Sequence, residues 1–196
     1  MIGIVGGSGD FGQGVAGRLG RAGHVVVIGS RSPRDEFVDN RECCTSSDVV
    51  FLSIPAASVE SMARELAPCL QGKIVVSVAT TVIFRDGRPV AEPGPISLAE
   101  TAARELPGAH VVSALHTVSA RLLAQLDQEL DEDTLVCGDD ADAKAQVIGL
   151  CEELVAGRAV DCGALTSSRS LETLTAALLN VNRLYRTNTG IRITGL

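Results

Sequence analysis

Short apolar runs alternate with amphipathic helical patterns along the whole chain. The runs are rich in Val, Ile and Leu, and such continuous runs are typical of strands that a sheet buries on both faces. We expect strands at residues 2–5, 24–28, 48–54, 73–78, 110–115, 134–137 and 158–161. Because helical patterns separate these runs, the sequence predicts an α/β fold with a doubly wound, mainly parallel sheet.

The helical patterns follow the first strand and recur at residues 57–69, 97–106, 119–127, 140–155 and 168–186. In the last of these, Leu171, Leu174, Leu178 and Val181 fall on one face at helical spacing. The chain is therefore expected to close with a long helix and a short tail.

In two segments the apolar residues show no clear helical or strand periodicity. Residues 31–47 are polar and short, so we expect a loop or a single helical turn there. Residues 79–96 contain three prolines and two glycines, which predicts a long irregular loop. Long loops in compact domains are often lids or binding loops, and we expect this one to cover a bound ligand.

The glycine-rich segment after the first strand is the strongest motif in the chain. Gly7, Gly9 and Gly12 form G-x-G-x-x-G between a predicted strand and a predicted helix, the context in which this pattern binds dinucleotides. The glycines permit a tight turn, close approach of a pyrophosphate and close packing of helix on strand, and the helix N-terminus offers N–H groups to the phosphates. We therefore expect a Rossmann-type domain over residues 1–163, followed by a C-terminal helix and tail over residues 164–196. The candidate cofactor residues of this segment are Gly7, Ser8, Gly9, Asp10, Phe11 and Gly12.

The end of the second strand indicates which dinucleotide binds. An NAD site usually carries Asp or Glu there, which binds the ribose 2′-hydroxyl. Here the strand ends in Gly29-Ser30-Arg31, so a hydroxyl and a guanidinium stand in that place. Both groups suit a 2′-phosphate, and the sequence predicts NADP(H), with Ser30 and Arg31 as ligands.

Composition and charge exclude several other functions. No apolar run reaches the roughly 18 residues of a membrane helix, and we expect no signal peptide because the first strand already begins at Met1 or Ile2. The net charge of −7 argues against nucleic acid as a partner, and an anionic ligand would need a local basic pocket.

The six cysteines form no C-x-x-C pair, so we expect no metal site and free, mostly buried thiols in a reducing cytoplasm. For the neighbouring Cys43 and Cys44, a redox role and a loop position without function are both open.

Candidate chemistry lies at the carboxyl ends of the predicted strands, where doubly wound sheets bind their ligands. His116 follows the fifth strand, and it is either a residue of the ligand crevice or a structural histidine at the strand end. Ile54 and Pro55 follow the third strand, and Ser77 and Val78 end the fourth, beside the expected path of the nicotinamide. Few acid–base groups stand out, which suits hydride transfer, since two bound rings need alignment more than proton transfer.

In order along the chain, many segments resemble the F420H2:NADP oxidoreductases, which are NADPH-dependent reductases of the deazaflavin coenzyme F420. The resemblance covers nearly the whole chain, and its most specific pieces are Ser113-Ala114-Leu115-His116-Thr117 and Cys137-Gly138-Asp139-Asp140. The other matching segments are Gly6 to Gly12, Val27 to Arg31, Ser53-Ile54-Pro55, Val111-Val112, Asp161-Cys162-Gly163, Ser168-Arg169, Glu172 to Thr175, Leu179-Asn180 and Gly190-Ile191.

The resemblance implies hydride transfer between NADP(H) and coenzyme F420, both of them small-molecule partners. By position, Ser8, Ser30 and Arg31 would hold the 2′-phosphate, and His116 and the backbone of Val118 would border the deazaflavin. The resemblance also implies a homodimer, with the final helix completing the acceptor site and contributing to the dimer contact.

The chain departs from this family in three places. The segment after Arg31 is shorter and lacks an expected basic residue, for which Arg34 is the candidate substitute. Small alanines at positions 56 and 57 stand where bulkier residues are usual, and residues 79–96 diverge. Because F420 is strongly anionic, we expect Arg85 or Arg88 of that segment to attract its acidic tail, the alternative being that both are solvated surface charges.

Two other functions fit the same residues. One is an NADPH-dependent reductase of a flavin or another small acceptor, since related Rossmann domains serve ferric reductases of membrane proteins. The other is a non-catalytic NADP-sensing module that regulates a partner. Turnover distinguishes an enzyme from a sensor, and the identity of the acceptor distinguishes the two enzymes.

Overall fold

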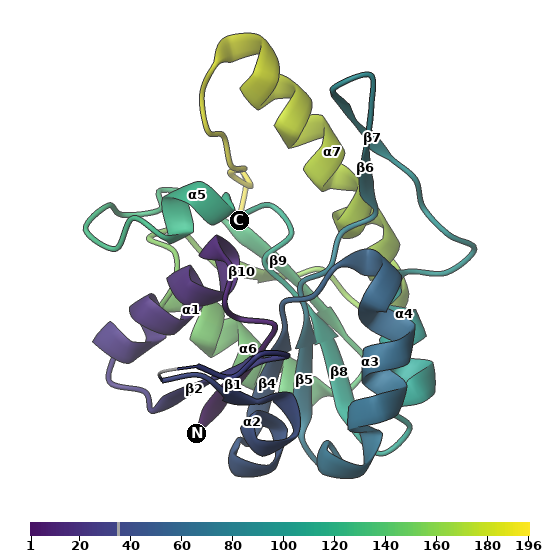
Figure 1. Ribbon diagram of the computed structural model, residues 1–196. Helices are drawn as coiled ribbons and strands as arrows, with labels where there is room; N and C mark the ends of the chain where they lie inside the picture. Colours follow the sequence, from purple (N-terminus) through teal and green to yellow (C-terminus); the bar gives the residue numbers. More distant parts are fainter. Residues whose placement is uncertain (35) are drawn as a thin grey trace.

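The computed structural model describes residues 1–34 and 36–196, and it shows a large sheet with helices on both faces (Figure 1). Within these residues, eight strands form the sheet in the order β10-β9-β8-β5-β4-β1-β2-β3. Their bounds are β1 (Ile2–Val5), β2 (Val26–Ser30), β3 (Val38–Asp39), β4 (Val49–Leu52), β5 (Ile74–Ser77), β8 (His110–Ser113), β9 (Thr134–Gly138) and β10 (Ala159–Asp161). Neighbours pair in parallel except β8 and β9, so that β9 and β10 run opposite to the other strands. The predicted doubly wound, mainly parallel sheet is confirmed.

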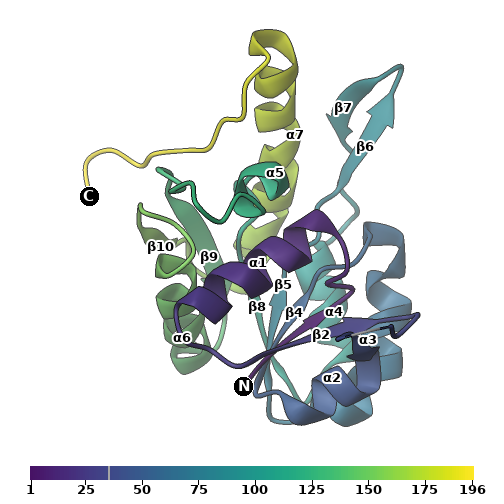
Figure 2. The ribbon, with the colours of Figure 1, turned by 60° about the vertical axis from the view of Figure 1, so that its left-hand side comes forward.

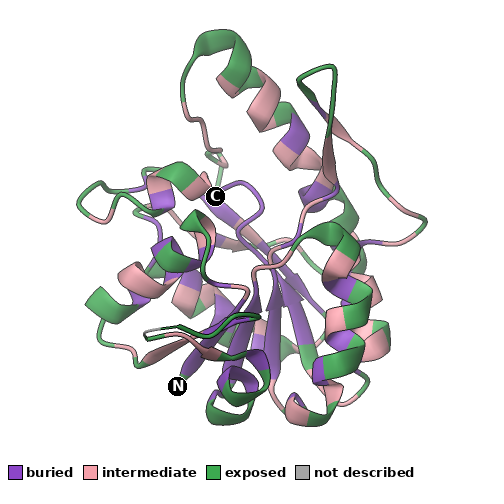
Figure 3. Cartoon of the chain, in the orientation of Figure 1, coloured by how far each residue is buried: buried purple, intermediate pink, exposed green. Residues whose placement is uncertain are grey.

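Two apolar cores lie on the two faces of the sheet, because successive strand residues point to opposite sides. In β4, Val49 and Phe51 belong to one core, while Val50 and Leu52 belong to the other. The helices that cover the first core are α1 (Asp10–Arg21), α5 (Ala120–Leu123) and α6 (Ala141–Glu152). Those that cover the second are α2 (Asn40–Ser46), α3 (Val59–Leu66) and α4 (Leu98–Glu105), with short 3₁₀ turns at Ala56–Ser58, Ala67–Cys69 and Leu165–Ser167. The central strands are consequently the most buried part of the fold (Figure 3).

The segment 31–47 is more regular than the sequence predicts. It holds β3 and the seven-residue helix α2, so the expected loop or single turn is wrong here, while Asp35 lies outside the described residues. Asp39 caps α2 by accepting a hydrogen bond from the N–H of Arg41 at 2.8 Å. Cys43 and Cys44 are fully buried, and burial raises the pKa of their thiols to about 11 and about 12. The helix was missed because these two small side chains are its main apolar anchors, and their full burial in the core is typical of structural rather than reactive thiols.

Residues 79–96 form a β-hairpin where the sequence predicts an irregular loop. Strands β6 (Val82–Arg85) and β7 (Arg88–Ala91) pair antiparallel around Asp86 and Gly87, whose φ angles are +48° and +71°. Two successive positive φ angles are those of a type I′ turn, for which Asp-Gly is a preferred sequence. The prolines of the segment concealed this signal. The hairpin stands beside the final helix, away from the sheet (Figures 1 and 2).

The final helix α7 (Ser168–Tyr185) confirms the predicted helix at residues 168–186. Of its predicted apolar face, Leu171 is buried, whereas Val181 is 37% exposed. The tail after α7 returns toward the sheet (Figure 1), and Ile191 of the tail pairs with Asp133. Among the helices that the structure describes, none has the length and apolar character needed to cross a membrane.

Candidate active site

The glycine-rich segment forms a tight turn between β1 and α1. Gly6 has a φ of +70°, and a Cβ atom there would meet the backbone of Ser53. A Cβ atom on Gly12 would overlap the backbone of Gly7, whereas one on Gly9 would meet no atom within 4 Å. The turn therefore needs glycine for packing at one end and leaves open space above Gly9. Since no described side chain caps α1, the N–H groups of its first turn are available to a ligand.

A cavity of about 750 Å³ opens beside this turn, at the carboxyl end of β2, and we call it the Ser–Arg cavity. Ser8, Ser30, Arg31 and Arg34 all line it, so the structure gathers the residues expected to bind a 2′-phosphate. The Ser30 hydroxyl accepts a hydrogen bond from the N–H of Ser32 at 3.2 Å, which shapes the turn after β2. Both arginines are exposed, so their guanidinium groups can meet an anion from solution.

Asn40, at the start of α2, also lines the Ser–Arg cavity, and sequence reasoning missed it. Its side chain is 6% exposed, and its Oδ1 atom has no donor among the described residues. A buried polar atom without a partner is costly unless a ligand or water supplies one. The signal that could have found it is its position directly after β3, the strand that pairs with the end of β2.

A second cavity, also of about 750 Å³, adjoins the first and is called here the His116 cavity. The two share residues 53–55, which follow β4, so they lie side by side at the carboxyl ends of the strands. The candidate residues that line the His116 cavity are Phe11, Ile54, Pro55, Val78, His116 and Val118. Ser77 does not reach either cavity, because it is 1% exposed within β5.

His116 is held from two sides. Its Nε2 atom lies 3.0 Å from the carbonyl oxygen of Ala79, and since a carbonyl only accepts, Nε2 carries the ring proton. The carbonyl oxygen of His116 accepts a hydrogen bond from the Thr175 hydroxyl at 2.7 Å. Burial lowers the pKa of the imidazole to about 4, so the ring is neutral at pH 7. Its Nδ1 atom is then a bare acceptor, without a partner in the part of the chain that the structure describes.

The far wall of the His116 cavity comes from the C-terminal part of the chain. Thr175, Leu178 and Asn182 of α7 line it together with Asn188 and Thr189 of the tail. The Oδ1 atom of Asn182 accepts hydrogen bonds from the N–H and the hydroxyl of Thr189, at 2.7 and 2.8 Å. Residues from the segment 164–196 therefore complete the cavity that contains His116.

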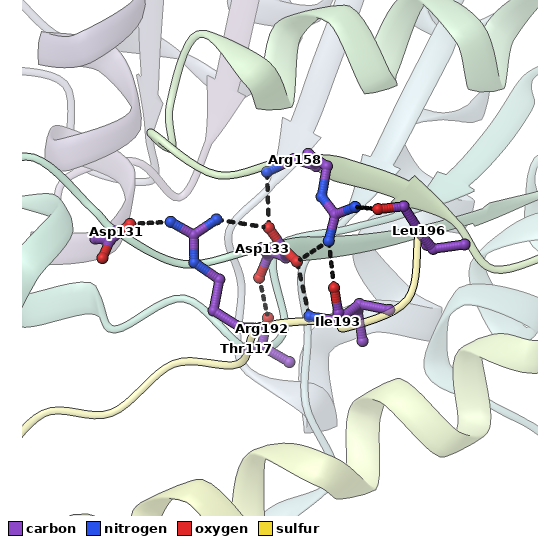
Figure 4. Close-up of polar contacts among 7 residues, drawn as sticks. All are labelled: Thr117, Asp131, Asp133, Arg158, Arg192, Ile193 and Leu196. Atoms are coloured by element: carbon purple, nitrogen blue, oxygen red, sulfur yellow. Dashed lines mark hydrogen bonds and ion pairs between the residues drawn. The ribbon is translucent and has the colours of Figure 1, made fainter.

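Asp133 fixes the tail that forms this wall (Figure 4). Its buried carboxylate pairs with Arg158 at 2.9 Å and with Arg192 at 3.1 Å, and it accepts a hydrogen bond from the N–H of Ile193 at 2.8 Å. These contacts, that of Arg158 above all, lower the pKa of Asp133 to about 2. Arg158 also donates to the carbonyl oxygens of Ile193 and Leu196. We call these contacts of Asp133 with Arg158, Arg192 and Ile193 the Asp133 clamp, and sequence reasoning missed them.

Glu132 is a second buried carboxyl group beside the same wall. It is 5% exposed, it packs directly against Gly190 of the tail, and its Oε1 atom has no partner among the described residues. Burial raises its pKa to about 7, although the N–H of Ser119 acts in the opposite direction. A side chain at Gly190 would overlap this carboxyl group, so Glu132 would have to move to admit one.

Dinucleotide-dependent oxidoreductases bind cofactor and substrate side by side at the carboxyl edge of a Rossmann sheet. The two adjoining cavities match this arrangement. The family described as NADP oxidoreductase coenzyme F420-dependent matches residues 1–81. The F420-dependent NADP reductase of Methanocaldococcus jannaschii is 36% identical over 221 residues, with 100% of this chain and 98% of that protein covered. The chain belongs to the family of F420-dependent NADP reductases.

Two further similarities differ in extent. A crystal structure of an Arthrobacter sp. FB24 protein, provisionally assigned as an F420-dependent NADP-reductase, has a TM-score of 0.87 and 28% identity over 99% of each chain. The human metalloreductase STEAP2 is 30% identical over 191 residues, which cover 93% of this chain but 37% of that protein. The second similarity is therefore confined to one part of a longer protein.

Proposed function

We propose that this protein transfers a hydride between NADP(H) and coenzyme F420 in the groove formed by the two cavities. The protein is an oxidoreductase by its family, and the name of its relatives specifies these two coenzymes. The observation that carries the proposal is the junction of the cavities at residues 53–55, where a nicotinamide and an acceptor ring would meet.

The residues of the Ser–Arg cavity fit NADP(H). The first-turn N–H groups of α1 receive the pyrophosphate, because a helix N-terminus attracts negative charge. Ser30, Arg31 and Arg34 receive the 2′-phosphate, and Asn40, which lines the same cavity, is a polar neighbour for the ribose. NADPH supplies the hydride when it is bound.

His116 orients the acceptor ring. At neutral pH its imidazole is uncharged and its Nε2–H is used by Ala79, so it is not a proton donor. The apolar side chains of Val78, Val118 and Leu178 line the same cavity and exclude water from the path of the hydride. The chain therefore contributes alignment and a dry environment, which is what hydride transfer between two bound rings requires.

Turnover with defined acceptors tests this function. Purified protein is mixed with NADPH and with F420, FMN or FAD, and the oxidation of NADPH is followed by its absorbance. We expect turnover with F420 and a higher kcat/KM for F420 than for either flavin. Faster turnover with a flavin would make the protein a flavin reductase. Binding of NADPH without turnover of any acceptor would make it an NADP-sensing module.

The proposal includes a homodimer built on α7 and the hairpin. Phe84, Leu184 and Tyr185 are 68%, 66% and 75% exposed, and all three lie on these two projecting elements. Exposed apolar groups gathered on one part of a surface are typical of protein interfaces. A second copy of the chain is the simplest partner, since symmetric dimers are the commonest oligomers.

A cytoplasmic location stays a prediction. All six cysteines are free thiols, and four of them are buried. Free thiols accord with a reducing compartment, in which disulfides are rare.

A further inference from the structure

Arg121 is the one charged residue among the described residues that line the His116 cavity, where the histidine itself is neutral. The protein carries a net charge of −7, so its overall field repels an anionic ligand. F420 carries a phosphodiester and glutamates on the tail attached to its ring. The Ser–Arg cavity has Arg31 and Arg34 for the phosphate groups of NADP(H), whereas Arg121 is the one arginine that lines the His116 cavity among the residues that the structure describes.

The helix that carries Arg121 is held firmly in place. Arg18 of α1 donates hydrogen bonds to the carbonyl oxygens of Leu122 and Leu123, at 3.1 and 2.9 Å, and to two later carbonyl groups. α5 also packs closely on α1, because a Cβ atom on Gly14 would lie 2.7 Å from the backbone of Leu123. The backbone of Arg121 is therefore fixed at the cavity while its side chain is exposed to solvent and to an incoming ligand.

The arginines of the hairpin are less suited to this task than the sequence predicts. Arg85 is paired with Glu92, and neither Arg85 nor Arg88 lines the His116 cavity. The hairpin residue that does line it is Val82, at the opposite end of β6 from the turn. The hairpin thus meets the cavity through its apolar base and carries its two arginines at its tip.

We propose that Arg121 binds the anionic, phosphate-bearing tail of F420 and so selects the complete coenzyme over the bare deazaflavin. This inference rests on the proposed function. The pyrophosphate of NADP(H) is also a phosphate-bearing anion that Arg121 could bind, and it would lie in the neighbouring Ser–Arg cavity. The F420 tail is the better match, because the pyrophosphate already has the N–H groups of α1.

The test compares Arg121→Gln and Arg121→Lys with the wild type, with Arg88→Gln as a matched control at an exposed arginine outside the cavity. KM and kcat are measured at low and high salt for NADPH, for F420 and for the deazaflavin that lacks the phosphodiester and glutamates. We expect Arg121→Gln to raise the KM for F420 about five- to tenfold at low salt, and less at high salt, as for an exposed charge-assisted contact. The KM values for NADPH and for the truncated deazaflavin should not change. Arg121→Lys keeps the positive charge, so its KM for F420 should stay close to that of the wild type. Arg88→Gln should have the wild-type KM values.

Several outcomes would overturn the inference. An equal rise in KM for complete and truncated deazaflavin would mean that Arg121 acts on the ring or on the fold. A rise in KM for NADPH alone would assign Arg121 to the pyrophosphate. A rise in KM for F420 in Arg88→Gln alone would mean that Arg88 of the hairpin, and not Arg121, binds the anionic tail of F420. If the wild type turns over F420 and Arg121→Gln is unchanged, this inference fails by itself. If the wild type neither turns over F420 nor binds it in a fluorescence titration, the proposed function fails as well.

Discussion

The imidazole of His116 and the carbonyl oxygen of Ala79 meet at 3.0 Å, and this contact joins the chain after β8 to the chain after β5. Two neighbouring parallel strands thereby fix the ring at the edge where the groove opens. Thr175 of α7 fixes the backbone of the same histidine from the other side. The proposed role of His116, to orient the acceptor ring without exchanging protons with it, follows from this neutral and internally bonded ring.

Replacing His116 by Asn should therefore lower kcat with F420 about tenfold to a hundredfold, since misplacement of a reacting ring by a small distance is costly. The KM for NADPH should stay nearly constant, because the Ser–Arg cavity does not include His116. Steady-state kinetics in both substrates measure the two effects. Since the pKa of His116 is about 4, wild type and variant should also share the same pH profile between roughly pH 6 and 8. Loss of NADPH binding, or an unfolded variant, would instead identify His116 as a structural residue.

The grouping of residues in the Ser–Arg cavity could be predicted from sequence because its parts are local. The segment 7–12 and the pair Ser30 and Arg31 belong to one strand–helix–strand unit, whose geometry the glycine pattern determines. Asn40 escaped prediction, because α2 is short and shows little apolar periodicity. The helix is recognised only when Cys43 is seen packed against the sheet.

The acceptor half depends on long-range contacts that no local pattern reveals. His116 could be nominated from its place after a strand, but its contact with Ala79 spans 37 positions and that with Thr175 spans 59. The clamp that joins Asp133 to Arg192 also spans 59 positions and forms only when the tail folds back on the sheet. Charged residues this far apart in sequence look like ordinary surface residues until the fold brings them together.

Replacing Arg31 by Ala should weaken NADPH binding by about 1.5–3 kcal/mol, the range for hydrogen bonds to charged groups. Binding of NADH should hardly change, because it lacks the 2′-phosphate. Titration of each dinucleotide, followed by calorimetry or fluorescence, measures both affinities. Equal losses for the two cofactors would contradict the assignment of Arg31 to the 2′-phosphate.

Replacing Asp133 by Asn should loosen the tail and raise the KM for F420 more than that for NADPH, because tail residues line only the His116 cavity. The pKa of Asp133 is lowered to about 2, so its contribution to the free energy of unfolding is present above about pH 4 and is lost as the pH falls toward 2. The variant should be less stable than the wild type at neutral pH and depend less on pH in the acid range. Urea denaturation at several pH values measures this.

Asp131→Asn is the matched control for the clamp. Asp131 also pairs with Arg192, but its side chain is 83% exposed, and exposed ion pairs contribute little. The control should leave stability and the KM for F420 close to wild type. If both substitutions had the same effect, the burial of Asp133 would not be the property that holds the tail.

Replacing Glu132 by Gln should change how stability depends on pH. Its pKa is raised from 4.5 to about 7, so the unfolded chain releases this proton before the folded protein does. The free energy of unfolding of the wild type should therefore fall as the pH rises from about 4.5 to 7 and stay lower above that range. Gln has the same shape without the charge, so the variant should lack this decline and have the higher Tm at alkaline pH. Glu129→Gln, at an exposed position, is the control and should keep the wild-type profile.

The proposed dimer predicts a specific change in assembly. Leu184 and Tyr185 are largely exposed at the end of α7, so replacing both by Glu should leave the core and the Tm unchanged but place charge within the interface. In sedimentation at micromolar concentration, the wild type should be a dimer and the variant a monomer. Val25→Glu, at an apolar position that is 63% exposed just before β2, should remain a dimer. A monomeric wild type would contradict the dimer.

The same variant also tests whether assembly supports the acceptor site. α7 carries Leu178 and Asn182, which line the His116 cavity and lie about two turns and about one turn before its exposed end. A partner that packs on that end would restrain the whole helix, so the monomeric variant should lose kcat/KM for F420 while its affinity for NADPH stays the same. A monomer with full activity toward F420 would mean that each chain forms its acceptor site alone, with the Asp133 clamp rather than a second subunit holding the wall in place.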